Sequence, residues 1–352
     1  MTLSLLIAVL VLAFAGTPPQ AVLLHLIVLT ALLFASVRWR VAPLAIVALA
    51  VAGIDLRFAY VSPAGSDVDD VTRAAISRML GGESPYGVTY SESVPPGSTF
   101  PYGPLTLLWY LPFSSPRRLE LFVSTCLVVV LAVRGRPLGL AVYATLIPLL
   151  VVASDGSNDN SAGLLLLIAL VSAERWPRVG AAVLGFAIAF KPYALAWAPA
   201  MVGWAGLAVL WPMLVAAAAF WLPALVAWGP IAIHDSLAGA EAAQLRVGAY
   251  YSLAWALKRW GSPIALETLN TLRLVVGLAA SALALFRTRS HAAMILVGTA
   301  IYLATLFLGA WSTFAYFAAI APTLCWYVDD WFGHADEGVD WLAEISRVGA
   351  RL

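Results

Sequence analysis

The sequence predicts an all-α, polytopic membrane protein. Of the 352 residues, 62% are hydrophobic and only 11% are charged, whereas soluble domains average about 25% charged residues. The apolar residues form long continuous runs rather than an alternating pattern, which favours helices over strands. A bilayer can be spanned only by helices or by closed barrels. Together these observations predict a bundle of transmembrane helices.

Short polar or basic turns separate the apolar runs, and each run is an expected span. A span needs about 20 apolar residues, so the boundaries of the shorter runs are approximate. The first run lacks the basic start of a signal peptide and is followed at once by another apolar run, which indicates an uncleaved helix. The expected spans are residues 2–15, 20–37, 41–61, 119–133, 138–153, 160–173, 178–190, 193–210, 211–228, 263–286, 291–309 and 313–331.

Basic residues in the short turns set the expected orientation, because Lys and Arg are enriched in cytoplasmic loops. Arginines mark the turns at residues 38–40, 134–136, 175–178 and 287–289. These turns share one side only if the proline-rich segment 101–113 does not cross the membrane. We therefore expect that segment to be re-entrant or interfacial, which leaves about twelve spans with both termini in the cytoplasm.

The expected domain organisation is a single transmembrane domain over residues 1–352. An outer loop at 62–118 carries a surface helix and the re-entrant segment, and an amphipathic cytoplasmic tail occupies 333–352. The net charge of +1 predicts no nucleic-acid partner. Both cysteines fall in apolar runs, where packing is their expected role.

Several polar segments are expected to meet on the outer face of the membrane. They are residues 62–100, 154–161 and 229–262, joined by Lys191 at the end of an apolar run. Polar groups at the membrane edge are costly, so their gathering on one side predicts a site. The sequence thus predicts a multi-pass cell-membrane protein whose site is extracytoplasmic.

The start of the outer loop predicts a short amphipathic helix that lies on the membrane surface. Its apolar face comprises Val68, Val71, Ala75 and Met79. Ser66 is a good N-cap, with Asp69 three residues further on as in a capping box. Asp67 and Asp70 complete an acidic first turn, which suits the helix dipole. Capping accounts for some of these acids, and a chemical role for one of them stays open.

Three motif-bearing segments follow one another in the chain. They read "SDVDDVTRAAISRMLGGESPYG" with "FPYGPLTLLWYLP" after it, then "GSNDNSAGLLLLIAL" from Gly156, then "GAAVLGFAIAFKPYALAWAP" from Gly180. This ordered set, over residues 55–200, resembles the GT-C class of glycosyltransferases, and most of all its mannosyltransferase-like group. The matching positions in the first segment are Asp67, Ala74–Ala75, Gly81–Gly82, Pro85–Tyr86 and Tyr102–Gly103–Pro104–Leu105.

The chain also departs from that group's pattern. Val71 stands where an aromatic residue is common, two additional spans precede the loop, and residues beyond 230 match loosely. The resemblance implies an enzyme that transfers a sugar, mannose or another hexose, from a polyprenyl-phosphate donor to a lipid or glycan acceptor. It implies no metal and no other cofactor.

Such a transfer needs a base for the acceptor hydroxyl and a cation for the departing phosphate. The resemblance places the base at Asp67, with Asp55, Asp69 and Asp70 as alternatives. A helix N-terminus lowers the pKa of Asp67, whereas the neighbouring acids raise it. Lys191 is the expected phosphate partner, and the alternative is a lysine that snorkels to the membrane interface.

The remaining candidates are substrate-binding residues. Arg246 is a second phosphate partner or an ordinary solvated charge. Asn158 and Asp159 either hydrogen-bond the sugar or cap the helix that follows them. Tyr102 and Asp70 complete the expected substrate-binding set.

The triplet Asp67–Asp69 also has the DxD spacing of metal sites that hold nucleotide sugars, with Asp70 as a third oxygen ligand. We do not expect such a site, because the chain has no Gly-rich phosphate loop and no soluble domain, and the loop faces away from the cytosol.

Two other classes of function compete with the enzyme. About twelve spans with both ends inside is also a common layout of membrane carriers, but those place broken helices and ionisable residues near the midplane, often in repeated halves. A structural subunit whose loop binds a partner is the third class. The expected partners of the enzyme are the lipid-linked donor, the acceptor and membrane lipids.

Overall fold

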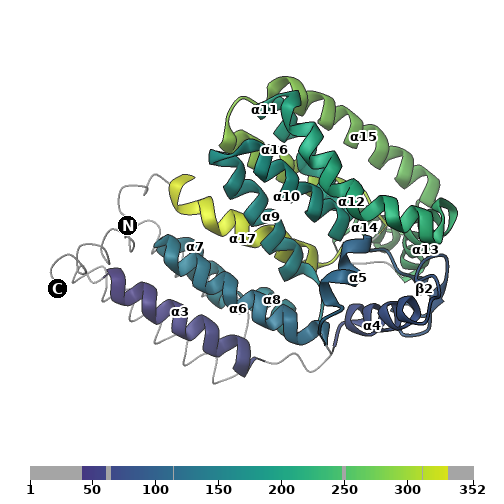
Figure 1. Ribbon diagram of the computed structural model, residues 1–352, viewed down its shortest axis with the longest axis horizontal. Helices are drawn as coiled ribbons and strands as arrows, with labels where there is room; N and C mark the ends of the chain where they lie inside the picture. The colour runs from purple at the N-terminus through teal and green to yellow at the C-terminus, as the bar shows by residue number, and fades with distance from the viewer. Residues whose placement is uncertain (1–41, 61–64, 114, 248–250, 311, 332–352) are drawn as a thin grey trace. The chain divides into compact units, whose positions relative to one another are not determined.

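The computed structural model of the chain describes residues 42–60, 65–113, 115–247, 251–310 and 312–331 (Figure 1). The expected spans at 2–15 and 20–37 and the tail at 333–352 lie outside these residues. The described part is helical apart from one antiparallel pair of two-residue strands, β1 (Thr89–Tyr90) and β2 (Ser98–Thr99). The predicted all-α fold class is therefore confirmed for this part of the chain.

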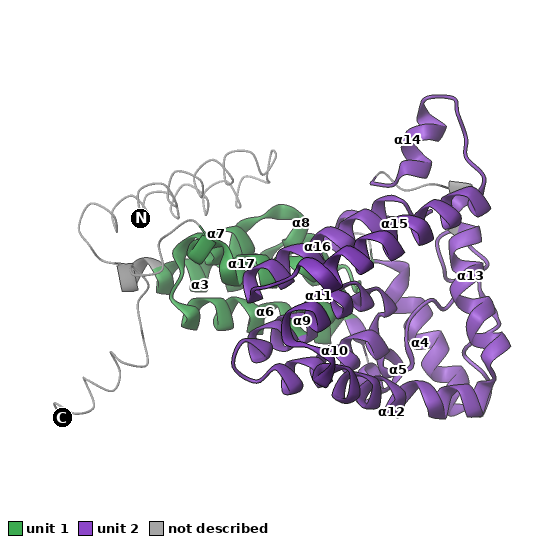
Figure 2. Ribbon diagram, turned by 90° about the horizontal axis from the view of Figure 1, so that it is seen from above, with its two compact units in different colours: residues 1–65, 117–164, 318–352 green, residues 66–116, 165–317 purple. Residues whose placement is uncertain are grey.

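The chain divides into two compact units (Figure 2). Unit 1 comprises residues 1–65, 117–164 and 318–352, and unit 2 comprises residues 66–116 and 165–317. The described helices of unit 1 are α3 (Ala42–Ala59), α6 (Pro116–Arg134), α7 (Pro137–Thr145), α8 (Ile147–Ser154), the start of α9 (Asp159–Arg175) and most of α17 (Phe314–Trp331).

In unit 1 the predicted span 138–153 is broken into α7 and α8, which meet at an angle of 58°. Pro148 has no N–H to donate to the carbonyl of Ala144, so a continuous helix would leave that oxygen without its partner. Arg57 of α3 supplies donors instead, to the carbonyls of Ala144 (3.2 Å) and Tyr143 (2.9 Å). Its remaining N–H groups reach Ser124 and Gly53, and the side chain is fully buried.

Unit 2 holds residues 66–116, the segment expected as an outer loop and called the outer-loop segment below, and the 22-residue helix α15. Its elements, besides the strands and the rest of α9, are α4 (Asp67–Leu80), α5 (Pro104–Tyr110), α10 (Pro177–Phe190), η1 (Pro192–Trp197), α11 (Ala198–Ala205), η2 (Leu207–Val209), α12 (Leu210–Trp228), α13 (Pro230–Val247), α14 (Leu253–Arg259), α15 (Leu266–Arg287) and α16 (His291–Phe307). Close packing joins α10 to α12, because a Cβ on Gly185 would lie 2.3 Å from the carbonyl oxygen of Met213.

Two helical segments of the described part are long and apolar enough to cross a membrane, Leu207–Trp228 and Leu266–Arg287. The bent pair α7–α8 would be a third if it forms one span. The predicted spans within the described residues all coincide with helices or with consecutive helices. The number of about twelve spans stays a prediction.

Candidate functional site

The short amphipathic helix predicted at the start of the loop is present as α4, and its place on a membrane surface stays a prediction. The Ser66 hydroxyl accepts a hydrogen bond from the N–H of Val68 (3.3 Å), which confirms the N-cap. Val71, Thr72 and Ala75 form the buried face, and the helix ends at Gly81. Apolar spacing and cap chemistry therefore determine this helix locally.

The acids of the first turn of α4 have different partners. Asp70 and Asp69 both pair with Arg73 one turn further along, the second at 3.4 Å. Asp67 points to another segment, because its carboxylate accepts a hydrogen bond from the N–H of Val94 (2.7 Å). Asp67 thus ties the start of the helix to the loop that follows it.

Burial raises the pKa of the Asp67 carboxyl, and this effect outweighs the backbone hydrogen bonds, including that of Val94, which lower it. The charge of Asp70 raises it slightly further. A carboxylate whose pKa is raised is a stronger base than an exposed one. The N-terminus of α4 on its own favours the charged carboxylate, but it does not decide the direction of the pKa shift of Asp67.

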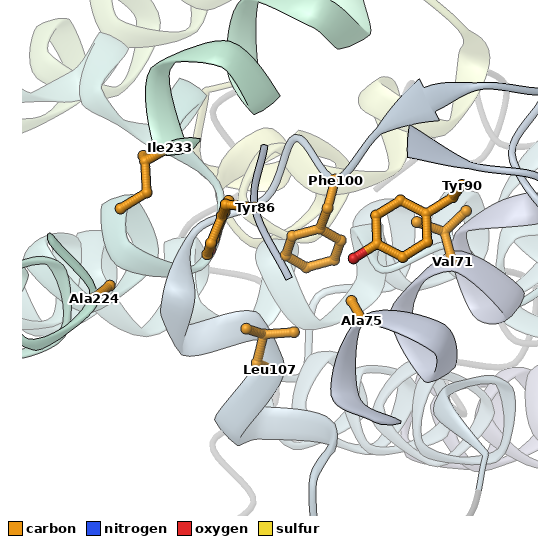
Figure 3. Packing of buried hydrophobic residues seen from close by; sticks show 8 residues of the cluster. All are labelled: Val71, Ala75, Tyr86, Tyr90, Phe100, Leu107, Ala224 and Ile233. Carbon is orange, nitrogen blue, oxygen red and sulfur yellow. The ribbon is translucent and has the colours of Figure 1, made fainter. Parts of the chain in front are cut away.

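A compact core supports α4 and the segment that follows it (Figure 3). Its buried members are Val71, Ala75, Tyr86, Tyr90, Phe100, Leu107, Ala224 and Ile233. The rings of Tyr86 and Phe100 pack edge to face at 5.6 Å, and Tyr86 also contacts Trp228 at the end of α12. The outer-loop segment is therefore a packed part of unit 2.

The Pro-Tyr and Tyr-Gly-Pro motifs meet in this core. The hydroxyl of Tyr86 donates a hydrogen bond to the backbone carbonyl of Tyr102 (2.9 Å). The ring of Tyr102 packs edge to face on Phe100 (5.3 Å). Two contacts from separate parts of the loop thus position Tyr102.

The next residues attach this segment to the end of α10. The N–H of Gly103 and the hydroxyl of Thr106 both donate to the carbonyl of Phe190, at 3.0 and 2.7 Å. These donors satisfy a carbonyl at a helix C-terminus, where no intrahelical partner is available. Only glycine fits at position 103, because a Cβ there would lie 2.0 Å from the carbonyl oxygen of Ala189.

Lys191 lies directly after α10 and is 2% exposed. Pro192 disfavours the helical conformation at Lys191, whose backbone is extended. Its ammonium nitrogen lies near the centres of three tyrosine rings, those of Tyr102 (5.4 Å), Tyr193 (5.1 Å) and Tyr316 (5.5 Å). We call these four residues the Lys191 cage. A snorkelling lysine would expose its ammonium group, so the burial argues against that alternative.

Other aromatic residues of unit 2 hold the cage in place. Tyr302 of α16 donates a hydrogen bond to the carbonyl of Tyr316 (2.8 Å). The ring of Tyr302 also packs on Tyr193 (5.1 Å) and on the buried Trp197 (5.1 Å). The cage therefore combines residues from the outer-loop segment, the α10–η1 junction and the first turn of α17, all of which belong to unit 2.

The predicted turn at 154–161 lies in unit 1 and is buried. Asn158 is 1% exposed, and neither its side-chain oxygen nor its nitrogen has a hydrogen-bond partner among the described residues. Burial raises the pKa of Asp155, against hydrogen bonds that Ser157 donates to it. Asp159, 3% exposed, is the first residue of α9.

The carboxylate of Glu120, in α6, lies at the N-terminus of α9 in unit 1. Its carboxylate accepts hydrogen bonds from the N–H groups of Asn160 (2.9 Å) and Ser161 (3.1 Å) and from the Ser161 hydroxyl. A carboxylate from another helix thus caps α9, and Asn158 is left without this role.

The structure brings two of the predicted site residues together, Tyr102 and Lys191. Asp67 and Asp70 lie at the start of α4, and Arg246 belongs to α13, although its side chain is outside the described part of the chain. Sequence reasoning missed Tyr193, which follows Lys191 by two positions, and Tyr316, for which the sequence carries no signal. Among the described residues, no cluster of three or more His, Cys, Asp or Glu side chains is arranged to hold a metal ion.

Comparisons with protein-family models, with curated proteins and with solved structures find no match to this chain. The fold and the Lys191 cage are therefore described from the residues of this chain alone.

Proposed function

We propose that the protein is an integral-membrane glycosyltransferase that takes a hexose from a polyprenyl-phosphate donor on the extracytoplasmic side, as its resemblance to the GT-C class implies. The observation that carries the proposal is the Lys191 cage. It places a buried cation beside the motif segments on which the resemblance depends.

The cage suits a phosphate group. An ammonium group gains about 0.5–2 kcal/mol from an aromatic ring, depending on how far it is desolvated. The three rings around the ammonium group hold the cation in a fixed position. A positioned cation in a water-poor site stabilises the charge that develops on a departing phosphate. Lys191 is thus the phosphate partner in this proposal, with Tyr102 beside it.

Asp67 is the general base of the proposal. Its raised pKa makes the carboxylate a better acceptor of the proton from the sugar-accepting hydroxyl. One carboxylate oxygen is held by Val94, which fixes the side chain at the start of α4. Asp69 and Asp70 are paired with Arg73 and are weaker candidates.

Asn158 belongs to unit 1 and is proposed by itself as a residue that binds a polar ligand such as a sugar. Buried amides are nearly always hydrogen-bonded, so a buried amide without a partner in the described structure supports a role toward a polar ligand. An amide can both donate and accept, which matches the hydroxyl groups of a hexose.

The test uses the purified full-length chain, synthetic polyprenyl-phosphate mannose or glucose, and a membrane lipid extract as acceptor. We expect release of polyprenyl phosphate by the wild type and a loss of about 10²- to 10³-fold in Lys191→Met. Arg178→Met, an exposed cation at the other end of α10, is the matched control and should keep its rate. Asp67→Asn should lose about 10²- to 10⁴-fold, with the exposed Asp235→Asn as its control.

One observation favours a membrane carrier as the second candidate. Unit 1 contains a broken helix pair, α7–α8, with the fully buried Arg57 at the break. Broken helices and buried charges line the substrate sites of many carriers. Solute flux in liposomes, together with no transfer from any polyprenyl-phosphate sugar, would reverse the order of the two proposals.

A further inference from the structure

The corner between α14 and α15 in unit 2 carries exposed basic and aromatic side chains. Lys258 and Arg259 end α14 and are exposed, and Trp260 is 76% exposed. The backbone there is ordered by hydrogen bonds, since the N–H groups of Trp260 and Ser262 donate to carbonyls of α14. The exposed Trp260 is therefore held at a fixed position beside the two cations.

The corner between α14 and α15 lies next to a helix that could cross a membrane. Figure 2 shows α14 projecting sideways from the end of the unit where α13 ends and α15 begins. The 22-residue α15 is one of the two segments of the described chain that could cross a membrane. At 1.5 Å per residue it is roughly 33 Å long, close to the ~30 Å hydrocarbon core. Where α15 crosses a membrane, its first residues lie at the level of the lipid headgroups, and Trp260 lies six residues before them in the chain.

The opposite end of α15 also carries an exposed aromatic side chain beside a basic one. Phe286 is 70% exposed and Arg287 ends the helix. Aromatic residues at both ends of an apolar helix are typical of a span whose ends lie in the two membrane interfaces.

We propose that Lys258, Arg259 and Trp260 form a docking surface for anionic phospholipid headgroups. Trp260 lies among the headgroups with its ring toward the acyl chains, and the two cations bind the lipid phosphates. A protein partner fits this corner less well, because stable interfaces use about 20–30 residues a side.

The experiment places a fluorescent probe in the full-length chain. The background is Cys126→Ala, in which the buried Cys325 is retained, and Ser262→Cys adds an exposed site for an environment-sensitive dye. The Cys126→Ala variant without Ser262→Cys is labelled in parallel, and its signal, which comes from Cys325, is subtracted. Single chains are reconstituted in nanodiscs of phosphatidylcholine with and without phosphatidylglycerol. Quenching by headgroup spin-labelled lipid is compared with quenching by aqueous iodide.

We expect lipid quenching to exceed iodide quenching and to increase when phosphatidylglycerol is present. Lys258→Gln and Arg259→Gln should each lower that increase by about fivefold, whereas Lys258→Arg should retain it. Trp260→Ser should increase iodide access in both lipids. Equal iodide quenching in both lipids, or protection that needs two chains in one disc, would overturn the proposal.

Discussion

The hydroxyl of Tyr86 donates a hydrogen bond to the backbone carbonyl of Tyr102 across 2.9 Å, and Tyr102 in turn faces the ammonium group of Lys191. The two motifs of the outer-loop segment are thus connected to the buried cation through one side chain. Tyr86 acts on the cation through Tyr102, so it is a positioning residue.

Tyr86→Phe removes this hydrogen bond and leaves the ring packing on Phe100 and Trp228 in place. We expect the free energy of unfolding to fall by about 1 kcal/mol, because one carbonyl loses its donor. Transfer from polyprenyl-phosphate donors should fall as well, because Tyr102 is no longer fixed. Unfolding in detergent and donor turnover measure the two effects. An unchanged rate at reduced stability would make Tyr86 merely structural.

Gly103→Ala is expected to disrupt the attachment of the loop segment to α10. The added Cβ would lie 2.0 Å from the carbonyl oxygen of Ala189, and overpacking of this kind costs about 1–3 kcal/mol or more. The unfolding midpoint in detergent measures the loss.

Gly81→Ala is the matched control, because its Cβ would lie 3.4 Å from the carbonyl oxygen of Arg78, its nearest neighbour in the described part of the chain. That variant should be close to the wild type in stability. Equal midpoints for both variants would mean that Gly103 and α10 do not pack as described.

The activity should depend on pH through Asp67. Because the base must be ionised, the rate should rise with pH through the raised pKa of Asp67. Asp67→Asn should abolish that rise as well as lower the rate. An inflection that persists in Asp67→Asn would assign the titration to another group.

Stability should change with pH in the opposite direction. The pKa of Asp67 is raised in the folded state above its ordinary value of 3.8, so folding favours the protonated carboxyl. That contribution is complete below the unfolded pKa and is lost as the pH rises through the folded pKa. Asp67→Asn keeps an oxygen that can accept from Val94 and should remove this dependence. Unfolding curves across the acidic range measure it.

Arg57→Met should destabilise unit 1 at the break between α7 and α8. The carbonyls of Tyr143 and Ala144 would lose their donors, at about 1–3 kcal/mol for each buried group left without a partner. Arg118→Met, an exposed arginine at the start of α6, controls for the loss of charge. A midpoint equal to that of the control would show that the break needs no guanidinium.

Leu278→Arg tests whether α15 crosses a membrane. Leu278 is 62% exposed in the middle of this helix, and an arginine at a span centre costs about 2.5–3.5 kcal/mol on insertion scales. We expect reduced insertion in a cell-free membrane assay. Ser262→Arg, before the helix, should insert as the wild type does, and equal insertion of both variants would argue against a span.

Local features of the fold could be predicted from the sequence. Apolar runs and their flanking turns determine where the described helices lie, because a backbone without water must bond within its own segment. The N-cap at Ser66 and the apolar face of α4 follow from neighbouring residues and needed no knowledge of the rest of the chain. Lys191 stood out for the same local reason, as a lone cation directly before a proline.

Contacts between distant segments could not be predicted in this way. The span expected at 138–153 is bent at Pro148, and Arg57 of another helix supplies the donors for the break. The direction of the pKa shift at Asp67 depends on the burial of the carboxyl, which helix-dipole reasoning leaves out.

The sequence by itself determined a helical, apolar chain, because composition, periodicity and capping act over a few positions. Its resemblance to the GT-C class singled out Asp67 and Tyr102, and Lys191 stood out as a lone cation at the end of an apolar run. Tertiary structure alone decided what these residues do in space. It placed Asp67 on Val94 and surrounded Lys191 with Tyr102, Tyr193 and Tyr316. The physical reason is that burial and cation–π contact depend on side chains far apart in the chain, which only packing brings together.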